Sequence, residues 1–183
     1  GLTILPLCEM SSNNTKIYGF EPSSRNFDAL KFNVKLNNCH KVILENCLVG
    51  EEDVHEALFY ETDDISATSS IVNNENRNFE KTFKKQVSID SYCQKNNLCP
   101  DLIKIDVEGA EISVLRGAKE TMKRFKPTIF LSVHPNQILQ LGGSEEDLLE
   151  IINYCGYSIS NIDGSQIDKF ESVEYLMTAN KGI

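Results

Sequence analysis

The sequence predicts an α/β fold, a three-layer sandwich with a mostly parallel sheet and an antiparallel pair of strands at its C-terminal end. Two observations support this prediction. Short β-branched and aromatic runs alternate with helical patterns through most of the chain, and the last two such runs follow one another without a helix. The 183 residues contain no repeat and no linker. We therefore expect a single domain over residues 1–183.

Hydrophobic spacing and the residues that end each run set the order of the expected elements. The first half should contain helices over residues 1–10 and 23–37, strands over 16–20, 40–49, 57–61 and 86–89, and a polar loop over 62–78. The second half should contain helices over residues 90–97, 109–125 and 144–154, and strands from 100, over 128–133, 157–162 and 173–179. Ser23 or Ser24 and Asp90 are residue types that cap helices. Acids at 145–147 suit the positive end of a helix.

The stretch from Leu102 to Gly117 is the most informative part of the chain. A β-branched run carries charges at alternate positions, Lys104, Asp106 and Glu108, and then turns into a helical pattern. Open α/β sheets bind ligands at the carboxyl ends of their strands, and charges are not buried without compensation. The stretch therefore indicates either a ligand site or a strand end with solvated acids.

Composition excludes several classes of function. A net charge of −9 argues against binding to a nucleic-acid backbone, and no apolar run approaches the roughly 20 residues that span a bilayer. The apolar start lacks the basic region of a signal peptide. Six cysteines show no metal-binding spacing, which favours reduced thiols and a cytoplasmic protein: Cys8, Cys39, Cys47, Cys93, Cys99 and Cys155.

Glu21 is the second candidate site residue. It follows the strand over 16–20 and precedes Pro22. An acid at this place in nucleotide-binding α/β domains accepts hydrogen bonds from ribose hydroxyls. The alternative is a surface acid before a turn. Gly1 is compatible with being the last glycine of a ligand-binding loop.

Four motifs together resemble the FkbM family of methyltransferases. They are Tyr-Gly-Phe-Glu-Pro (18–22), Ser-Ile-Asp-Ser-Tyr (88–92), Ile-Lys-Ile-Asp-Val-Glu-Gly-Ala-Glu (103–111) and Val-Leu-Arg-Gly-Ala (114–118). The resemblance runs from Gly1 to about Tyr157, and residues 103–111 are its most specific part. Leu-Ser-Val-His-Pro (131–135) and the pair Ser69-Ser70 fit a subset of the family.

The resemblance implies a Rossmann-like, S-adenosylmethionine-dependent enzyme that methylates a hydroxyl group of a sugar, glycan or other small natural product. The implied cofactor-binding residues are Gly1, Glu21, Pro22, Asn46, Cys47, Leu48 and Asp106. The implied acceptor-binding residues are Ser69, Ser70 and Lys104, although Lys104 has pairing with a neighbouring acid as its simpler role. The first strand and an Asp-x-Gly-x-Asn loop of the family are expected to precede Gly1, and without them the sheet should have a gap.

Proton removal from an alcohol acceptor needs a general base, and His134, Asp106 and Glu108 are the candidates. His134 has an unperturbed pKa of about 6.5, close to working pH, and follows the strand over 128–133; the alternative is a histidine that caps a strand turn. The same three side chains could hold a divalent ion, but their spacing is weak evidence, so we expect no metal.

Two alternative functions stay open at this stage. A nicotinamide-dependent dehydrogenase would use Glu21 equally well, but it does not account for residues 103–111. A truncated or degenerate Rossmann-like domain would have no activity of its own. The acceptor should be shaped by residues 63–78 and 136–143, and a homodimer is one candidate for the oligomeric state.

Overall fold

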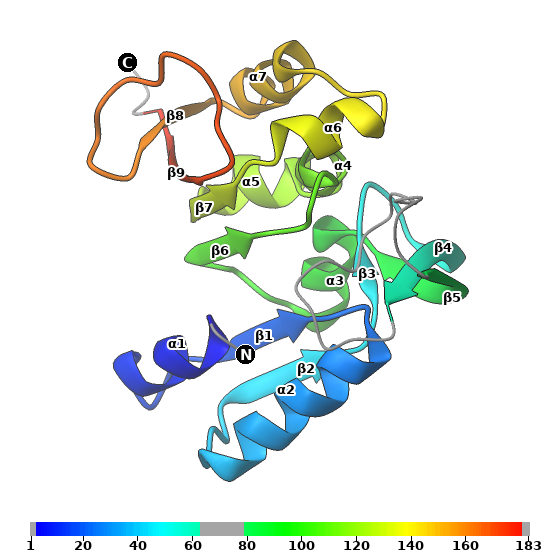
Figure 1. Cartoon of the computed structure of the whole chain (residues 1–183). Coiled ribbons are helices and arrows are strands. Elements are labelled where there is room, and N and C mark those ends of the chain that lie inside the picture. The colour runs from blue at the N-terminus through cyan, green and yellow to red at the C-terminus, as the bar shows by residue number, and fades with distance from the viewer. Residues whose placement is uncertain (1–2, 63–78, 181–183) are drawn as a thin grey trace.

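The structure is a computed structural model, and it describes residues 3–62 and 79–180. Its helices are α1 (Ile4–Met10), α2 (Ser24–Leu36), α3 (Ile89–Asn96), α4 (Glu111–Arg116), α5 (Lys119–Phe125), α6 (Pro135–Gln140) and α7 (Glu145–Tyr154). Its strands are β1 (Ile17–Phe20), β2 (Val42–Glu45), β3 (Leu48–Val49), β4 (Val54–Thr62), β5 (Phe79–Val87), β6 (Leu102–Ile105), β7 (Thr128–Ser132), β8 (Tyr157–Asn161) and β9 (Glu174–Ala179). Helices and strands alternate along most of the chain (Figure 1), which confirms a mixed α/β fold.

The strands form three separate sheets, so the prediction of one mostly parallel sheet is wrong. The sheets are β1-β2, β3-β5-β4 and β6-β7-β9-β8. Three strand pairs are parallel and three are antiparallel. The predicted antiparallel pair at the end of the chain is confirmed as β8 and β9. Within the described residues, β1 pairs with β2 alone and β6 with β7 alone, and no strand joins β1 to β6, which agrees with the expected gap in the sheet.

The middle of the chain forms a longer hairpin than the sequence predicts. The expected short strands over 57–61 and 86–89 are replaced by β4 and β5, which are nine residues long each and pair antiparallel with a register shift between Val54 and Ala57. Ser88 caps α3 instead of extending a strand, because its hydroxyl accepts a hydrogen bond from the Ser91 amide at 3.1 Å. The expected strand over 40–49 divides into β2 and β3, which belong to different sheets.

The expected helix over 109–125 is broken at Gly117 into α4 and α5. The Asp90 carboxylate accepts hydrogen bonds from the amides of Glu120 and Thr121, at 3.0 and 2.7 Å, and so caps α5 from another segment. The Gly117 carbonyl accepts from the Asp90 amide at 2.9 Å. These tertiary hydrogen bonds satisfy the free backbone groups of the helix ends. The break at Gly117 is therefore stable, even though the spacing of apolar residues in the sequence continues across it.

The hydrophobic core surrounds the four-stranded sheet. Fully buried side chains from β7, α4, α5, α7 and β9 pack together, among them Leu131, Leu115, Met122, Leu148 and Met177. Each such side chain contributes about 1.5–3 kcal/mol on burial. This core fixes β6 and β7 side by side, and their carboxyl ends carry the candidate site. None of the helices within 3–62 and 79–180 has the length and apolarity to cross a membrane.

Candidate functional site

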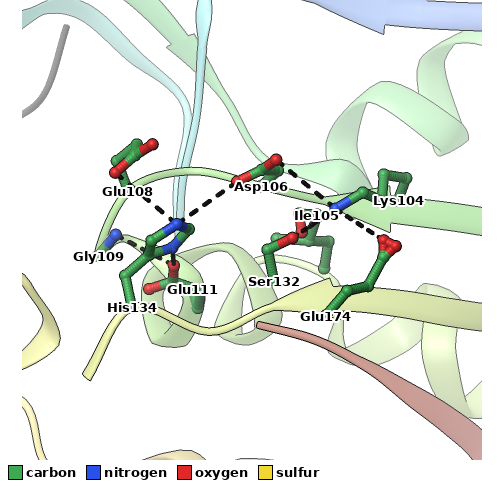
Figure 2. Close-up of polar contacts among 9 residues, drawn as sticks. All are labelled: Lys104, Ile105, Asp106, Glu108, Gly109, Glu111, Ser132, His134 and Glu174. Atoms are coloured by element: carbon green, nitrogen blue, oxygen red, sulfur yellow. Dashed lines mark hydrogen bonds and ion pairs between the residues drawn. The ribbon is translucent and has the colours of Figure 1, made fainter. Parts of the chain in front are cut away.

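The carboxyl ends of β6 and β7 bring the predicted catalytic residues together. The two strands are parallel, with Ile105 paired to Leu131. Asp106 therefore follows β6 at the same edge of the sheet at which His134 follows β7. Glu108 lies on the connection from β6 to α4, and Figure 2 shows the three side chains converging.

His134 lies at the centre of this cluster. Its Nε2 atom is 3.7 Å from an Asp106 carboxylate oxygen and 3.7 Å from a Glu108 oxygen. The Nδ1 atom lies 2.6 Å from Oε1 of Glu111 (Figure 2). The His134 side chain is 15% exposed, Asp106 is 51% exposed and Glu111 is fully buried. The Nδ1 edge of the imidazole ring is thus held in the interior by Glu111, while Nε2 faces the more exposed carboxylates of Asp106 and Glu108.

The turn between β6 and α4 gives Glu108 its position. Glu108 has a φ of 49° and Gly109 a φ of 107°. Residues other than glycine seldom adopt a positive φ. The backbone of Glu108 is therefore strained, and strained backbone of this kind is concentrated at functional sites. The Gly109 amide donates to Glu111 Oε1 at 3.1 Å, which closes the turn onto α4.

Neighbouring carboxylates alter the protonation of the site. The hydrogen bond to Glu111 is the main reason that the pKa of His134 is raised, with Glu108 and Asp106 adding to it and burial opposing it. Burial raises the pKa of Glu108, against the effect of His134. His134 in this setting is a stronger base than a free imidazole.

Lys104 is tied into contacts of its own. Its Nζ atom donates to the Ser132 hydroxyl at 2.6 Å and forms ion pairs with Glu174 at 3.3 Å and Asp106 at 3.7 Å (Figure 2). The side chain is 19% exposed. These contacts link β6, β7 and β9 and agree with the simpler role, pairing with a neighbouring acid. Its assignment as an acceptor-binding residue stays a prediction.

The predicted cofactor-binding residues form a second group, at the ends of β1 and β2. One carboxylate oxygen of Glu21 accepts from the Ser23 amide at 2.9 Å, and burial raises the pKa of Glu21. The Asn46 side-chain amide donates to the carbonyls of Glu21 and Pro22, at 2.8 and 3.2 Å. This bridge holds the two strand ends together.

Cys47 and Leu48 lie behind that bridge. Both are buried, at 4% and 5% exposure, and burial raises the pKa of the Cys47 thiol to about 11. These two side chains pack in the interior, so a ligand at this edge would meet the Asn46 side chain and the backbone instead.

Other predicted positions fall outside this description or differ from it. Gly1, Ser69, Ser70 and the segment 63–78 lie outside the described residues. The expected loop over 136–143 is largely helix α6, which begins with Pro135 at its first position and has His134 as its N-cap residue. Proline is favoured at the first helical position because its missing N–H is not needed there.

Comparison with known proteins identifies the family. The family model described as the methyltransferase FkbM domain matches residues 4–159. The chain belongs to the FkbM methyltransferase family. The crystal structure of methyltransferase FkbM from Methylobacillus flagellatus KT is similar in fold, with a TM-score of 0.63 at 17% sequence identity. That match covers 97% of this chain, which spans 40% of the length of the matched chain. A comparison with curated proteins gives no significant match.

One member of the cluster was not predicted from the sequence of this FkbM-family chain. In the sequence, Glu111 is the last residue of the 103–111 motif and an acid of a type that suits the first turn of a helix, and neither feature marks it as a site residue. The available signal was the short spacing from Glu108 to Glu111, which places both acids in the segment that leads from β6 into α4. The sequence carried no sign that Glu111 meets His134, because that contact joins residues 23 positions apart.

The same cluster bears on metal binding. One ligand atom each from Asp106, Glu108 and His134 lie within 4.8 Å of one another. This spacing suits proton transfer as well as ion binding, since a base and its flanking carboxylates need the same proximity. The expectation that no metal binds stays a prediction.

Proposed function

We propose that this FkbM-family chain is part of an enzyme that transfers a methyl group from S-adenosylmethionine to a hydroxyl of a sugar, glycan or other small natural product. The observation that carries the proposal is the imidazole of His134 at the carboxyl end of β7, with Asp106 and Glu108 3.7 Å from its Nε2 atom. An imidazole of raised basicity at a strand edge suits removal of a proton from an alcohol.

The residues at the end of β1 fit the cofactor that the family implies. The Glu21 carboxylate accepts from the Ser23 amide and from the Asn26 side chain, and its two oxygens have further lone pairs that can accept from a ribose hydroxyl. Asn46 holds the neighbouring strand end in place. Glu21, Asn46 and, at the end of β6, Asp106 would hold the cofactor. When bound, S-adenosylmethionine supplies a methyl group on a positively charged sulfur, which makes the carbon electrophilic.

The protein's own groups then manage the proton and the charge. His134 Nε2 takes the proton of the acceptor hydroxyl as the oxygen bonds to the methyl carbon. Asp106 and Glu108 lie beside Nε2 and stabilise the imidazolium that results. Lys104 holds Asp106 through its ion pair, so Lys104 acts here through Asp106.

The negative charge of the carboxylates around His134 also favours one class of acceptor. Asp106, Glu108 and Glu111 all lie within 3.7 Å of the His134 ring nitrogens. A phosphate or carboxylate group on the acceptor would be repelled by these acids, whereas a neutral hydroxyl is not. We therefore propose a neutral polyhydroxylated acceptor, and a homodimer stays open as the form in which it acts.

Two measurements test the function. Calorimetric titration should show binding of S-adenosylmethionine and not of NAD; binding of NAD alone would support a dehydrogenase, and binding of neither would support a domain without activity of its own. His134→Gln should reduce methyl transfer to a panel of sugars by about 100-fold or more, the usual size of a general-base effect, with cofactor affinity unchanged. His40→Gln is the matched control, because His40 is exposed. An undiminished rate in His134→Gln would exclude the base role.

A further inference from the structure

Glu111 is a buried charged residue with an unusual environment. Of the charged residues that the structure describes, it alone is buried, at 0% exposure. Its Oε2 atom is buried without a hydrogen-bond partner in the described part of the chain. A carboxylate in such surroundings destabilises a fold unless it is paired. The pairing that Glu111 does have should therefore show what it does.

Both polar contacts of Glu111 are made by its second carboxylate oxygen, Oε1. Oε1 accepts from the Gly109 amide at 3.1 Å and meets His134 Nδ1 at 2.6 Å (Figure 2). An ionised carboxylate has no proton to donate, so Oε1 of the Glu111 carboxylate accepts from the ring as it does from the Gly109 amide, and Nδ1 is the protonated nitrogen. Nε2 then carries the lone pair, on the side of Asp106 and Glu108.

We propose that Glu111 is a positioning residue, which fixes the orientation and tautomer of His134 and stabilises its imidazolium form. This inference rests on the proposed function of His134 as the general base. During methyl transfer the acceptor proton moves to Nε2, the Nδ1 proton stays on the ring, and Glu111 remains a carboxylate. The C–S bond breaks as the O–C bond forms, and the sulfur keeps the electron pair.

Every charged group near the ring has to be considered in a test of this role. Glu111 reaches His134 from α4, Asp106 and Glu108 reach it from the connection between β6 and α4, and Lys104 faces Asp106 from β6. Of these, Glu111 makes the shortest contact and the largest contribution to the raised pKa of His134. A residue that only closes the turn at Gly109 would not change the titration of the ring.

Nuclear magnetic resonance of the histidine rings tests the proposal without any cofactor or acceptor. The sequence has three histidines, and His134→Gln assigns the signal. We expect His134 to be the Nδ1-protonated tautomer, with a pKa above about 6.5. Glu111→Gln keeps the shape and removes the charge, and it should lower that pKa toward the value of a free imidazole, because the contact with Glu111 is the largest cause of the raised pKa. Glu120→Gln, an exposed acid on α5, should leave it unchanged.

Three results would overturn the proposal: a wild-type His134 that titrates at or below about 6.5, the Nε2-protonated tautomer, or an unchanged pKa in folded Glu111→Gln. If that variant does not fold, the wild-type tautomer and pKa decide the question by themselves, and Glu111→Asp supplies a variant that keeps the charge but retracts it. In methyl-transfer assays the acidic limb of the pH profile should move with the measured pKa. A shifted His134 pKa beside an unchanged rate in His134→Gln would refute the base role while leaving the Glu111 contact established.

Discussion

Replacing Gly109 by alanine would place a methyl group between the turn after β6 and helix α6. A Cβ atom at this position would lie 2.6 Å from Gln137 Cβ and 2.9 Å from the Gln137 backbone carbon. The φ of 107° is also unfavourable for alanine. A residue held in such a conformation costs about 1–3 kcal/mol, and overpacking costs about 1–3 kcal/mol more. Gly109→Ala should therefore lower the free energy of unfolding by about 2–6 kcal/mol.

Gly142→Ala separates the two contributions. Gly142 has a φ of 81°, and a Cβ there meets nothing within 4 Å, so alanine suffers the backbone strain without the contact. Urea unfolding followed by far-ultraviolet circular dichroism suits both variants, because the chain has no tryptophan. Gly109→Ala should lose about 1–3 kcal/mol more than Gly142→Ala. Equal losses would refute the close packing of the turn against α6.

Three further predictions follow from the fold and the site. Gly117→Ala should destabilise the protein by about 1–3 kcal/mol in chemical unfolding, because a Cβ there would lie 2.1 Å from the Gly50 carbonyl oxygen. Alanine favours helices, so a gain in stability would contradict this close contact. Asp90→Ala should cost about 1–2 kcal/mol in thermal unfolding, since it removes both hydrogen bonds that cap α5, and Asp90→Asn should recover part of the loss. The pKa of His134 is raised in the folded protein, so protonated His134 stabilises the fold below about pH 6.5, and this stabilisation is lost as the pH rises through the folded pKa. The stability difference between wild type and His134→Gln should therefore be larger at about pH 5.5 than at about pH 9. The opposite order would contradict the raised pKa.

The sequence predicts the location of the site because the signals for it are local. The charges of 104, 106 and 108 interrupt a run that would otherwise be buried, and Gly109 marks the turn that follows. His134 stands after the next strand of the sheet. Parallel pairing of β6 with β7 is then sufficient to bring Asp106, Glu108 and His134 together.

Features that depend on distant segments could not be predicted in the same way. The break at Gly117 depends on Asp90, which caps α5 from 30 residues away. The gap between β1 and β6 is expected from the family resemblance, but the separate sheet of β3, β5 and β4 depends on which strands pair, and apolar spacing does not encode pairing. Residues 80–86 of β5 include three lysines, which makes the sequence pattern resemble a loop. In the hairpin Lys81 and Lys85 are exposed, and Lys84 is compensated by an ion pair with Glu61 at 3.1 Å.

Glu111 shows how fold and site depend on each other. A fully buried carboxylate is unfavourable alone, and the Gly109 amide supplies only part of its compensation. The remainder comes from His134, whose ring is oriented by that same carboxylate. Loss of His134 should then leave a buried charge without its partner, which destabilises a protein more than loss of both members of the pair. The double variant His134→Gln with Glu111→Gln should accordingly be more stable than His134→Gln alone, because a neutral amide at 111 removes the uncompensated charge.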